Sequence, residues 1–388
     1  MKTYLSSVDL NVLSKGLGGL LSGCRFDKAY SLPGNGLRVR LHASNVGARD
    51  LVIYPNFVCV SSFNYPQLEE AGNFAMVLRK HLEGLVVKSV RQHAFERILE
   101  FSFEGKGRFV LIVELFSKGN VILCDQEKKI VGLLERQRWK DRTLTPGREY
   151  LYPPSVENPL EMDEGRFKTL LTGSGRNLVA TLASMGLGGF YAEEICLQAG
   201  LNKMMPAGSL TGEEAEKAYR ELKSLASLIE KNAVKPAIVL DKDGSYIDVV
   251  PFEFKTYLQN SKKAFSSFND AIDEYFSSLQ SMSLKTESQR DYSKELGKLQ
   301  LILDKQQEAL ARLQEEAIAC QQTGDLIYQN KELIEKIVEQ IQKARKQGLS
   351  DKQIEERFTI GKTKNISEAK AFKKLEKNKL TLELGLDL

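Results

Sequence analysis

Apolar and polar side chains alternate with a period of two in the second quarter of the chain, a pattern typical of half-buried strands. The alternation is clearest over 97–104, where every second residue from Leu99 to Phe103 is apolar. Two more apolar segments follow, over 108–115 after a turn that contains glycine and over 119–124 after a second such turn. These segments predict consecutive strands of an antiparallel sheet.

The rest of the first 155 residues alternates between helical and extended patterns. Apolar spacing predicts helices over 9–21 and 73–82. Further strands are predicted at 38–41, 50–54, 57–60 and 129–134. Because the connections have hairpin length, the sheet is expected to be mainly antiparallel, and residues 1–155 form an α+β domain.

Residues 156–233 predict a small helical domain built around a glycine-rich turn. Its order Gly186-Leu187-Gly188-Gly189, followed by alanine and isoleucine, is the helix-hairpin-helix pattern. Gly186, Gly188 and Gly189 would leave backbone amides exposed at a helix N-terminus, where a phosphate can bind. A packing element without a ligand explains the same pattern, and both interpretations stay open.

The last part of the chain is predicted to be helical. Residues 234–285 predict a strand pair and a helix that returns to the first domain, and 286–388 predict a coiled coil with following helices. Leucines spaced by seven support about four heptads, which end in a break at 321–325. Gly348 ends the next helix, and Ser350 with Gln353 forms a capping box. The coiled coil is compatible with a homodimer and with a helix that folds back.

Composition restricts the class of protein. The 388 residues are 42% hydrophobic and 27% charged, as in soluble proteins of several domains. A net charge of +4 does not by itself indicate a nucleic-acid binder. Five basic residues fall within one short stretch with Trp139, however: Arg136, Arg138, Lys140, Arg142 and Arg148. They are either a solvated loop or a basic rim that contacts phosphates, whose binding would depend steeply on salt.

Several classes of site are not indicated. No apolar run reaches the roughly 18 residues of a membrane helix, and the start lacks a signal-peptide pattern, so we expect a cytoplasmic protein without membrane contact. The five cysteines are scattered singly, and the three histidines lack metal-ligand spacing. No P-loop or nucleophile elbow occurs. We expect no metal, no cofactor and no enzyme activity, although His93 lies near Glu96 and could serve as an acid or base.

Five motifs occur in a fixed order along the chain. They are Asp9 in a leucine-rich helix, Glu96-Arg97 before a strand, a Glu-Leu-x-x-Lys-Gly-Asn-x-Ile-Leu run over 114–123, Pro146 to Tyr150 with two later prolines, and Ser267 to Ala271. In this order they resemble the NFACT family, which includes RqcH in bacteria and archaea and NEMF in eukaryotes, and whose older name is fibronectin-binding protein A. The family has Asp-Arg where this chain has Glu96-Arg97. Family members continue with a second coiled-coil strand and a further domain, so we expect a fragment or a short member.

The resemblance implies a ribosome-associated quality control factor. Such a factor binds a stalled large ribosomal subunit that still carries peptidyl-tRNA. It recruits an aminoacyl-tRNA, alanyl in prokaryotic members, for untemplated addition of a C-terminal tail. The ribosome performs the chemistry, so the factor itself is not expected to be an enzyme.

The resemblance also implies which residues engage tRNA. Asp9, Glu96 and Arg97 match the family positions, and arginine suits the role because its planar guanidinium can grip phosphate or stack on a base. Asp9 and Glu96 are expected to accept hydrogen bonds from base amino groups. Three weaker candidates are expected near the same end of the sheet: Gln92, Lys118 and Asn120.

The expected layout is similar to that of formamidopyrimidine-DNA glycosylases, whose nucleophile is an N-terminal proline. This chain begins Met1-Lys2 and lacks their zinc finger, so we reject glycosylase activity while expecting the related fold. The alternatives are a nucleic-acid-binding protein on that fold, a fibronectin-binding surface adhesin, and an inert coiled-coil scaffold.

Overall fold

The computed structural model describes residues 1–388 except 45–46, 140–141, 378 and 384–388, and it leaves the side chains of 282–294 undescribed. The described chain divides into two compact units, Met1–Leu284 and Lys285–Leu388, and each is described by itself. Within the described residues, no helix is both long enough and apolar enough to cross a bilayer.

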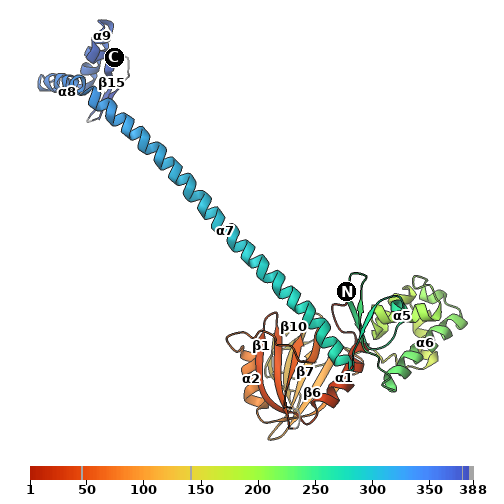
Figure 1. The fold of residues 1–388 in the computed structure, drawn as a ribbon. Coiled ribbons are helices and arrows are strands. Elements are labelled where there is room, and N and C mark those ends of the chain that lie inside the picture. Colours follow the sequence, from red (N-terminus) through yellow and green to blue (C-terminus); the bar gives the residue numbers. More distant parts are fainter. Residues whose placement is uncertain (45–46, 140–141, 378, 384–388) are drawn as a thin grey trace. The chain divides into compact units, whose positions relative to one another are not determined.

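An antiparallel sheet dominates the first unit (Figure 1), as the sequence predicts. Among the described residues its strand order is β4-β3-β2-β1-β5-β6-β7-β8-β9. The strands are β1 (Arg25–Leu32), β2 (Gly36–Ala43), β3 (Gly47–Tyr54), β4 (Phe57–Ser61), β5 (Val86–Gln92), β6 (Ile98–Glu104), β7 (Arg108–Glu114), β8 (Asn120–Asp125) and β9 (Ile130–Leu133). β1 and β5 meet at a single pair, Arg25 with Val86, so the sheet is narrowly joined at its middle.

Successive residues of β6 and β7 point into two different apolar layers. Leu99 and Val113 point into the main core with helices α1 (Ser7–Leu21) and α2 (Asn73–Leu82). Ile98 and Ile112 point to the opposite face, where they pack with Tyr150 in a smaller core. Described residues between 130 and 152, on both sides of the undescribed 140–141, cover this second face; they include β10 (Gln137–Arg138) and β11 (Thr143–Leu144). Both faces of this half of the sheet are therefore buried.

Strands β1 and β5 were not predicted from the sequence. Each contains an irregularity that shifts its register, between Phe26 and Lys28 in β1 and between Val87 and Ser89 in β5. An extra residue interrupts the period of two, so the apolar pattern no longer reads as one strand. Helix α2, by contrast, has the predicted bounds, and α1 begins two residues before the predicted start.

A helical part follows the sheet along the chain. Its helices are α3 (Glu164–Thr172), α4 (Leu178–Leu182), η1 (Ala183–Leu187), α5 (Gly189–Ala199), η2 (Ala207–Ser209) and α6 (Gly212–Glu230). The chain bends at Gly186, whose φ of 96° is costly for residues with a Cβ. This bend, with Gly188 as the N-cap of α5, forms the predicted hairpin.

A three-stranded sheet of described residues, ordered β13-β12-β14, closes the first unit. Its elements are β12 (Ala237–Leu240), β13 (Tyr246–Val250), η3 (Lys255–Tyr257) and β14 (Lys262–Ala264). Helix α7 (Phe268–Gln329) begins against β4, because Asn269 accepts a hydrogen bond from the backbone N–H of Val60 and Asp273 accepts one from Ser62.

The second unit contains the later part of α7 and a small folded region. The predicted break at 321–325 is wrong, since α7 continues to Gln329. The other elements are α8 (Lys331–Lys346), α9 (Asp351–Thr363), α10 (Ser367–Ala371), β15 (Phe372–Glu376) and β16 (Lys379–Leu382). Ser350 caps α9 with Gln353 as predicted, and Ile337, Phe358 and Phe372 pack in a separate core.

Candidate nucleic-acid interface

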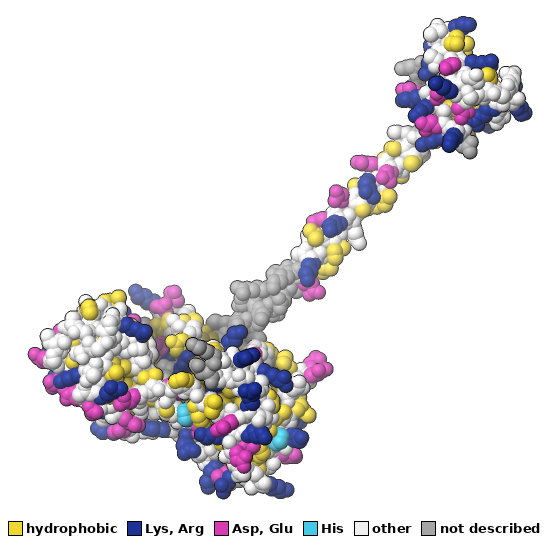
Figure 2. Space-filling model, turned by 180° about the vertical axis from the view of Figure 1, so that it is seen from behind, with side chains coloured by type: hydrophobic (Ala, Val, Ile, Leu, Met, Phe, Trp, Pro, Cys, Tyr) yellow, Lys and Arg dark blue, Asp and Glu magenta, His cyan; other side chains and the backbone are white. Residues whose placement is uncertain are grey.

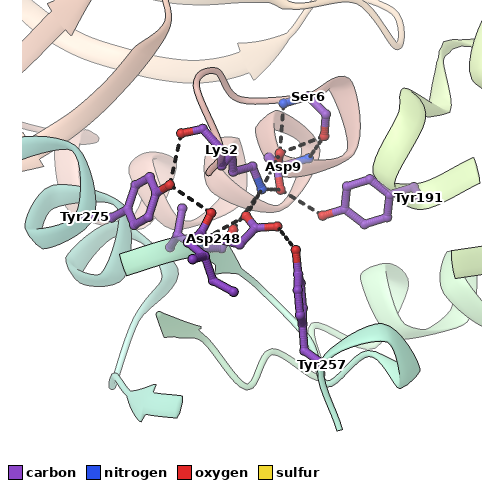
Figure 3. Close-up of polar contacts among 9 residues, drawn as sticks. Lys2, Ser6, Asp9, Tyr191, Asp248, Tyr257 and Tyr275 are labelled. Carbon is purple, nitrogen blue, oxygen red and sulfur yellow. Dashed lines mark hydrogen bonds and ion pairs between the residues drawn. The ribbon is translucent and has the colours of Figure 1, made fainter. Parts of the chain in front are cut away.

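Lys2 places a buried ammonium group between two carboxylates (Figure 3). Its Nζ lies 3.0 Å from Asp9 Oδ2 and 3.4 Å from Asp248 Oδ1, and it donates a hydrogen bond of 2.8 Å to the carbonyl of Val249. Burial by itself would lower the pKa of Lys2, but attraction to Asp9 and Asp248 raises that pKa above its ordinary value. Lys2 is therefore charged at neutral pH, and its amine has no free lone pair for nucleophilic attack.

Two tyrosines complete this cluster (Figure 3). Tyr191 of α5 donates a 2.8 Å hydrogen bond to Asp9, and Tyr257 donates one of 2.7 Å to Asp248. Burial first, and then the neighbouring carboxylates, raise the pKa of both hydroxyls, so both remain protonated donors. The cluster thus joins α1, α5 and β13, which are far apart in the sequence.

Asp9 is fully buried, and its carboxylate is already occupied. One oxygen accepts hydrogen bonds from the backbone N–H and the hydroxyl of Ser6, at 2.8 and 2.7 Å. The other accepts from Lys2 and Tyr191. The expected hydrogen bond from a base amino group to the Asp9 carboxylate does not fit this arrangement, because Asp9 is not exposed to solvent. Asp9 instead positions the first residues of the chain.

Gln92 fixes the turn that precedes β6. Its amide nitrogen donates to the carbonyls of Ser7, at 2.9 Å, and Glu96, at 2.8 Å, and its oxygen accepts from Asn11. With both ends of its amide engaged, Gln92 ties the turn to the first helix. The turn also contains Ala94 with a φ of 47°, a value that non-glycine residues seldom adopt. Gln92 therefore holds Glu96 and Arg97 in place.

The Glu96-Arg97 pair lies directly before β6, where the sequence predicts it. The Arg97 guanidinium lies over the ring of Tyr4, 4.8 Å from its centroid, and Tyr4 is 49% exposed. Burial lowers the pKa of Arg97, opposed by Tyr4 and Glu96. Glu96 accepts a 3.0 Å hydrogen bond from the backbone N–H of Val156. Arg97 and Tyr4 thus form a partly exposed, flat cationic surface.

The strand register brings the weaker candidates to the same end of the sheet. Ile98, which follows Arg97, pairs with Glu114, and Glu114 pairs with Asn120. Lys118 is exposed in the turn between β7 and β8. Asn120 is buried, and its side chain donates to and accepts from the backbone of Glu135. Lys118 therefore faces solvent, whereas Asn120 closes the connection between β8 and β9.

Arg142 does not belong to an exposed basic rim. Its guanidinium is buried and makes two hydrogen bonds to Glu114, of 2.6 and 3.0 Å. Tyr150 donates to the same carboxylate at 2.7 Å, and burial followed by the charge of Glu114 raises the pKa of Tyr150. The prediction that Arg142 contacts phosphates on an exposed rim is wrong, because its charge is neutralised inside the smaller core.

The other rim residues have different surroundings. Arg136 and Arg138 are exposed, and Lys140 lies outside the described residues. Figure 2 shows Lys and Arg side chains mixed with Asp and Glu over the face that it draws, in keeping with the modest net charge. Any attraction for a polyanion must therefore come from local groups rather than from a uniformly basic face.

The glycine hairpin packs toward the Lys2 cluster. A Cβ on Gly188 would lie 3.7 Å from the Cβ of Ser6, and one on Gly186 would lie 3.4 Å from the ring of Phe95. Gly188 and Gly189 line a pocket of about 280 Å³ together with Lys2 and Tyr257. These distances are ordinary van der Waals contacts, so the positive φ angles of Gly186 and Gly188, 96° and 78°, explain these two glycines better than packing does. A Cβ on Gly189 would meet nothing within 4 Å, and phosphate binding at Gly186, Gly188 and Gly189 remains a prediction.

The neighbours of His93 explain its position without a role as a catalytic acid or base. Its ring stacks on Tyr152 with centroids 3.5 Å apart, and its Nδ1 lies 3.1 Å from Glu100. Tyr152 donates to the same carboxylate at 2.6 Å. In the described part of the chain, no group of three or more His, Cys, Asp or Glu side chains could hold a metal ion.

Sequence reasoning missed Lys2 and Tyr4 as members of this site. Both precede the first helix, where no periodic pattern marks a residue as buried or exposed. The signal for Tyr4 in the sequence was an aromatic residue close before the first helix. Its contact with Arg97 joins two residues that are far apart in the sequence.

Comparison with known sequences gives one consistent set of relatives. Residues 6–379 match the NFACT N-terminal and middle domains. The chain is 33% identical over 359 residues to the archaeal Rqc2 homolog aRqcH of Methanocaldococcus jannaschii, which covers 89% of this chain and 53% of that protein. It is 24% identical over 369 residues to the ribosome quality control complex subunit NEMF of Homo sapiens, covering 89% and 34%. The chain thus spans about half of the archaeal relative and about a third of the human one.

Two solved structures share the fold of the first unit. One is the fibrinogen binding protein from Staphylococcus aureus, with a TM-score of 0.58 and 21% identity over 70% of this chain and 98% of that one. The other is the N-terminal part of the fibronectin/fibrinogen-binding protein from Streptococcus suis, with a TM-score of 0.56 and 22% identity over 71% and 99%. At this identity the likeness concerns the fold alone.

Proposed function

Because this chain belongs to the NFACT family, we propose that it acts in ribosome quality control. It binds a large ribosomal subunit that retains peptidyl-tRNA, and it recruits an aminoacyl-tRNA, alanyl-tRNA in particular, for untemplated C-terminal tailing. The names of its relatives support a role in ribosome quality control. The recruitment step rests on the residues at the end of the sheet.

The observation that carries tRNA binding is the Arg97 surface. Gln92 holds the turn before Arg97, and the ring of Tyr4 lies against the Arg97 guanidinium. The side chains of Arg97 and Tyr4 are both partly open to solvent. An arginine in this setting can grip a phosphate or stack under a base, and the ring beside it extends the same surface. Asp9 acts through Lys2 and Ser6, which orient the segment that carries Tyr4.

The chain itself performs no chemistry in this proposal. Lys2 is charged and paired with two carboxylates, and His93 is stacked on Tyr152. The peptidyl-transferase centre of the ribosome forms the new peptide bonds, and this chain positions the tRNA that delivers the amino acid.

Sedimentation with ribosomal subunits tests the proposal. Large subunits that carry peptidyl-tRNA should pull the chain into the heavy fraction, whereas empty large subunits and small subunits should do so more weakly. Arg97→Ala should reduce co-sedimentation only when alanyl-tRNA is present. A matched control is Arg108→Ala, an exposed arginine at the opposite end of β7. Equal sedimentation with all subunits would contradict the proposal, as would retention on immobilised fibronectin without ribosome binding.

A further inference from the structure

An open groove of about 480 Å³ lies beside the β10–β11 hairpin. Its walls are Arg138, Trp139, Thr143, Arg148, Glu149 and Leu151. Trp139 is 41% exposed, and its backbone N–H donates a 2.8 Å hydrogen bond to the carbonyl of Arg142 across the hairpin. The hairpin therefore presents a large, partly exposed aromatic ring at the surface. We call this site the Trp139 groove.

One charged residue that lines the Trp139 groove is already neutralised by a buried partner. Arg142 lines the groove, but both of its hydrogen bonds to Glu114 are buried, so its charge is already paired. Arg138 and Arg148 are exposed, and among the described residues that line the groove Glu149 is the one acidic side chain besides them. The groove thus combines two exposed cations with a partly exposed aromatic ring.

A single-stranded nucleic acid matches this combination. Stacking on an aromatic ring accepts any base, because every base has a π-face, and arginines beside the ring contact the phosphates on either side. A duplex keeps its bases stacked on one another and cannot offer one to the tryptophan without unpairing. An acidic peptide would satisfy the arginines but would leave the ring without a stacking partner.

We propose that the Trp139 groove binds an unpaired segment of RNA, with a base stacked on Trp139 and the flanking phosphates on Arg138 and Arg148. This inference rests on the proposed function, which supplies RNA as the ligand. The groove and Arg97 belong to the same end of the β6–β7 ladder, since Glu114 under the groove pairs with Ile98.

Trp139 is the single tryptophan of the chain, so its fluorescence reports on this groove alone. We would titrate the full chain with a short oligouridine and follow tryptophan emission, with a duplex and polyglutamate as comparison ligands. Oligouridine should quench the emission at low salt, and the apparent affinity should fall as salt is raised. Arg138→Ala and Arg148→Ala should each weaken quenching, and Arg108→Ala should not. Quenching by duplex or polyglutamate as strong as by oligouridine would overturn the proposal.

Anisotropy of labelled oligouridine provides a second readout that does not need the tryptophan. Trp139→Ala should weaken binding roughly tenfold, as expected for loss of one stacked base, and Trp139→Phe should restore part of the affinity. Equal binding by both variants and the wild-type chain would overturn the proposal. Binding of tRNA that depends on Arg97 but not on Trp139 would reject the groove and leave the proposed function standing. A chain that binds no RNA at all would reject both.

Discussion

The ammonium group of Lys2 lies 3.0 Å from the carboxylate of Asp9, and this buried contact ties the start of the chain to the first helix. Tyr4 stands two residues after Lys2 and lies under the guanidinium of Arg97. A buried ion pair therefore determines where the exposed aromatic ring meets Arg97. Asp9, one of the three residues that the family resemblance implies for tRNA binding, is therefore buried and connected to the Arg97 surface through Lys2.

Replacing Lys2 by methionine should destabilise the first unit. The substitution leaves the carboxylates of Asp9 and Asp248 buried without their shared cation, and breaking such a pair costs about 3–5 kcal/mol. The melting temperature should fall by several degrees. Lys106→Met, at an exposed turn position, is the matched control and should have little effect.

The pH dependence of stability gives a further check on Lys2. Its folded pKa is raised, so its contribution is complete below the ordinary value of 10.5 and is lost as pH rises through the folded pKa. The difference in unfolding free energy between wild type and Lys2→Met, measured by urea unfolding, should therefore become smaller as the pH is raised into the alkaline range. A difference that stays constant, or one that is absent at neutral pH, would contradict the buried ion pair.

Arg142 and Arg138 should respond differently to substitution, although they are four residues apart. Arg142→Met removes the partner of a buried carboxylate and should cost about 3–5 kcal/mol of unfolding free energy. Arg138→Met changes an exposed side chain and should leave the melting temperature within experimental error. Denaturant unfolding of both variants measures the contrast, and equal destabilisation would mean that Arg142 is not paired inside the smaller core.

Substitutions at Tyr4 and Asp9 should distinguish a residue that contacts tRNA from one that positions its neighbours. Tyr4→Ala should leave the melting temperature almost unchanged and weaken tRNA binding, because the ring is half exposed and faces Arg97. Asp9→Asn should lower both, since it removes the charge that Lys2 requires. Paired thermal melts and tRNA titrations test this. An Asp9→Asn variant that melts normally but loses tRNA binding would instead support direct contact by Asp9.

The sequence predicts elements where a regular period continues unbroken. Strand β6 and helix α2 were predicted from their regular apolar spacing, and β7 and β8 from apolar runs between glycine-containing turns, whereas register shifts hid β1 and β5. The predicted helix break at Gly324 did not occur, since a single glycine costs only about 1 kcal/mol within a helix. The sequence motifs identified Asp9 and Asn120 as candidates but could not predict where their side chains point. That direction depends on Tyr191 and Glu135, which only the fold brings near.

The heptad seam of α7 should mediate self-association. Leu296, Leu303 and Leu310 are 46–58% exposed, although their spacing is that of a coiled-coil interface. Sedimentation velocity should therefore show dimers that increase with concentration. Leu303→Gln with Leu310→Gln should abolish them, and Lys305→Gln with Glu308→Gln, which lie off the seam, should not. A wild-type chain that stays monomeric at every concentration would contradict the dimer.

The most direct test of the account measures tRNA binding by fluorescence anisotropy, with deacylated and alanylated tRNA at two salt concentrations. The comparison is between Arg97→Ala and Arg108→Ala, two single-arginine losses at opposite ends of the same strand pair. Loss of a charge-assisted contact at Arg97 should weaken binding by about tenfold or more, while Arg108→Ala binds like the wild type. Thermal melts must show that both variants stay folded. Equal affinities for the two variants would contradict the assignment of the tRNA site to Arg97.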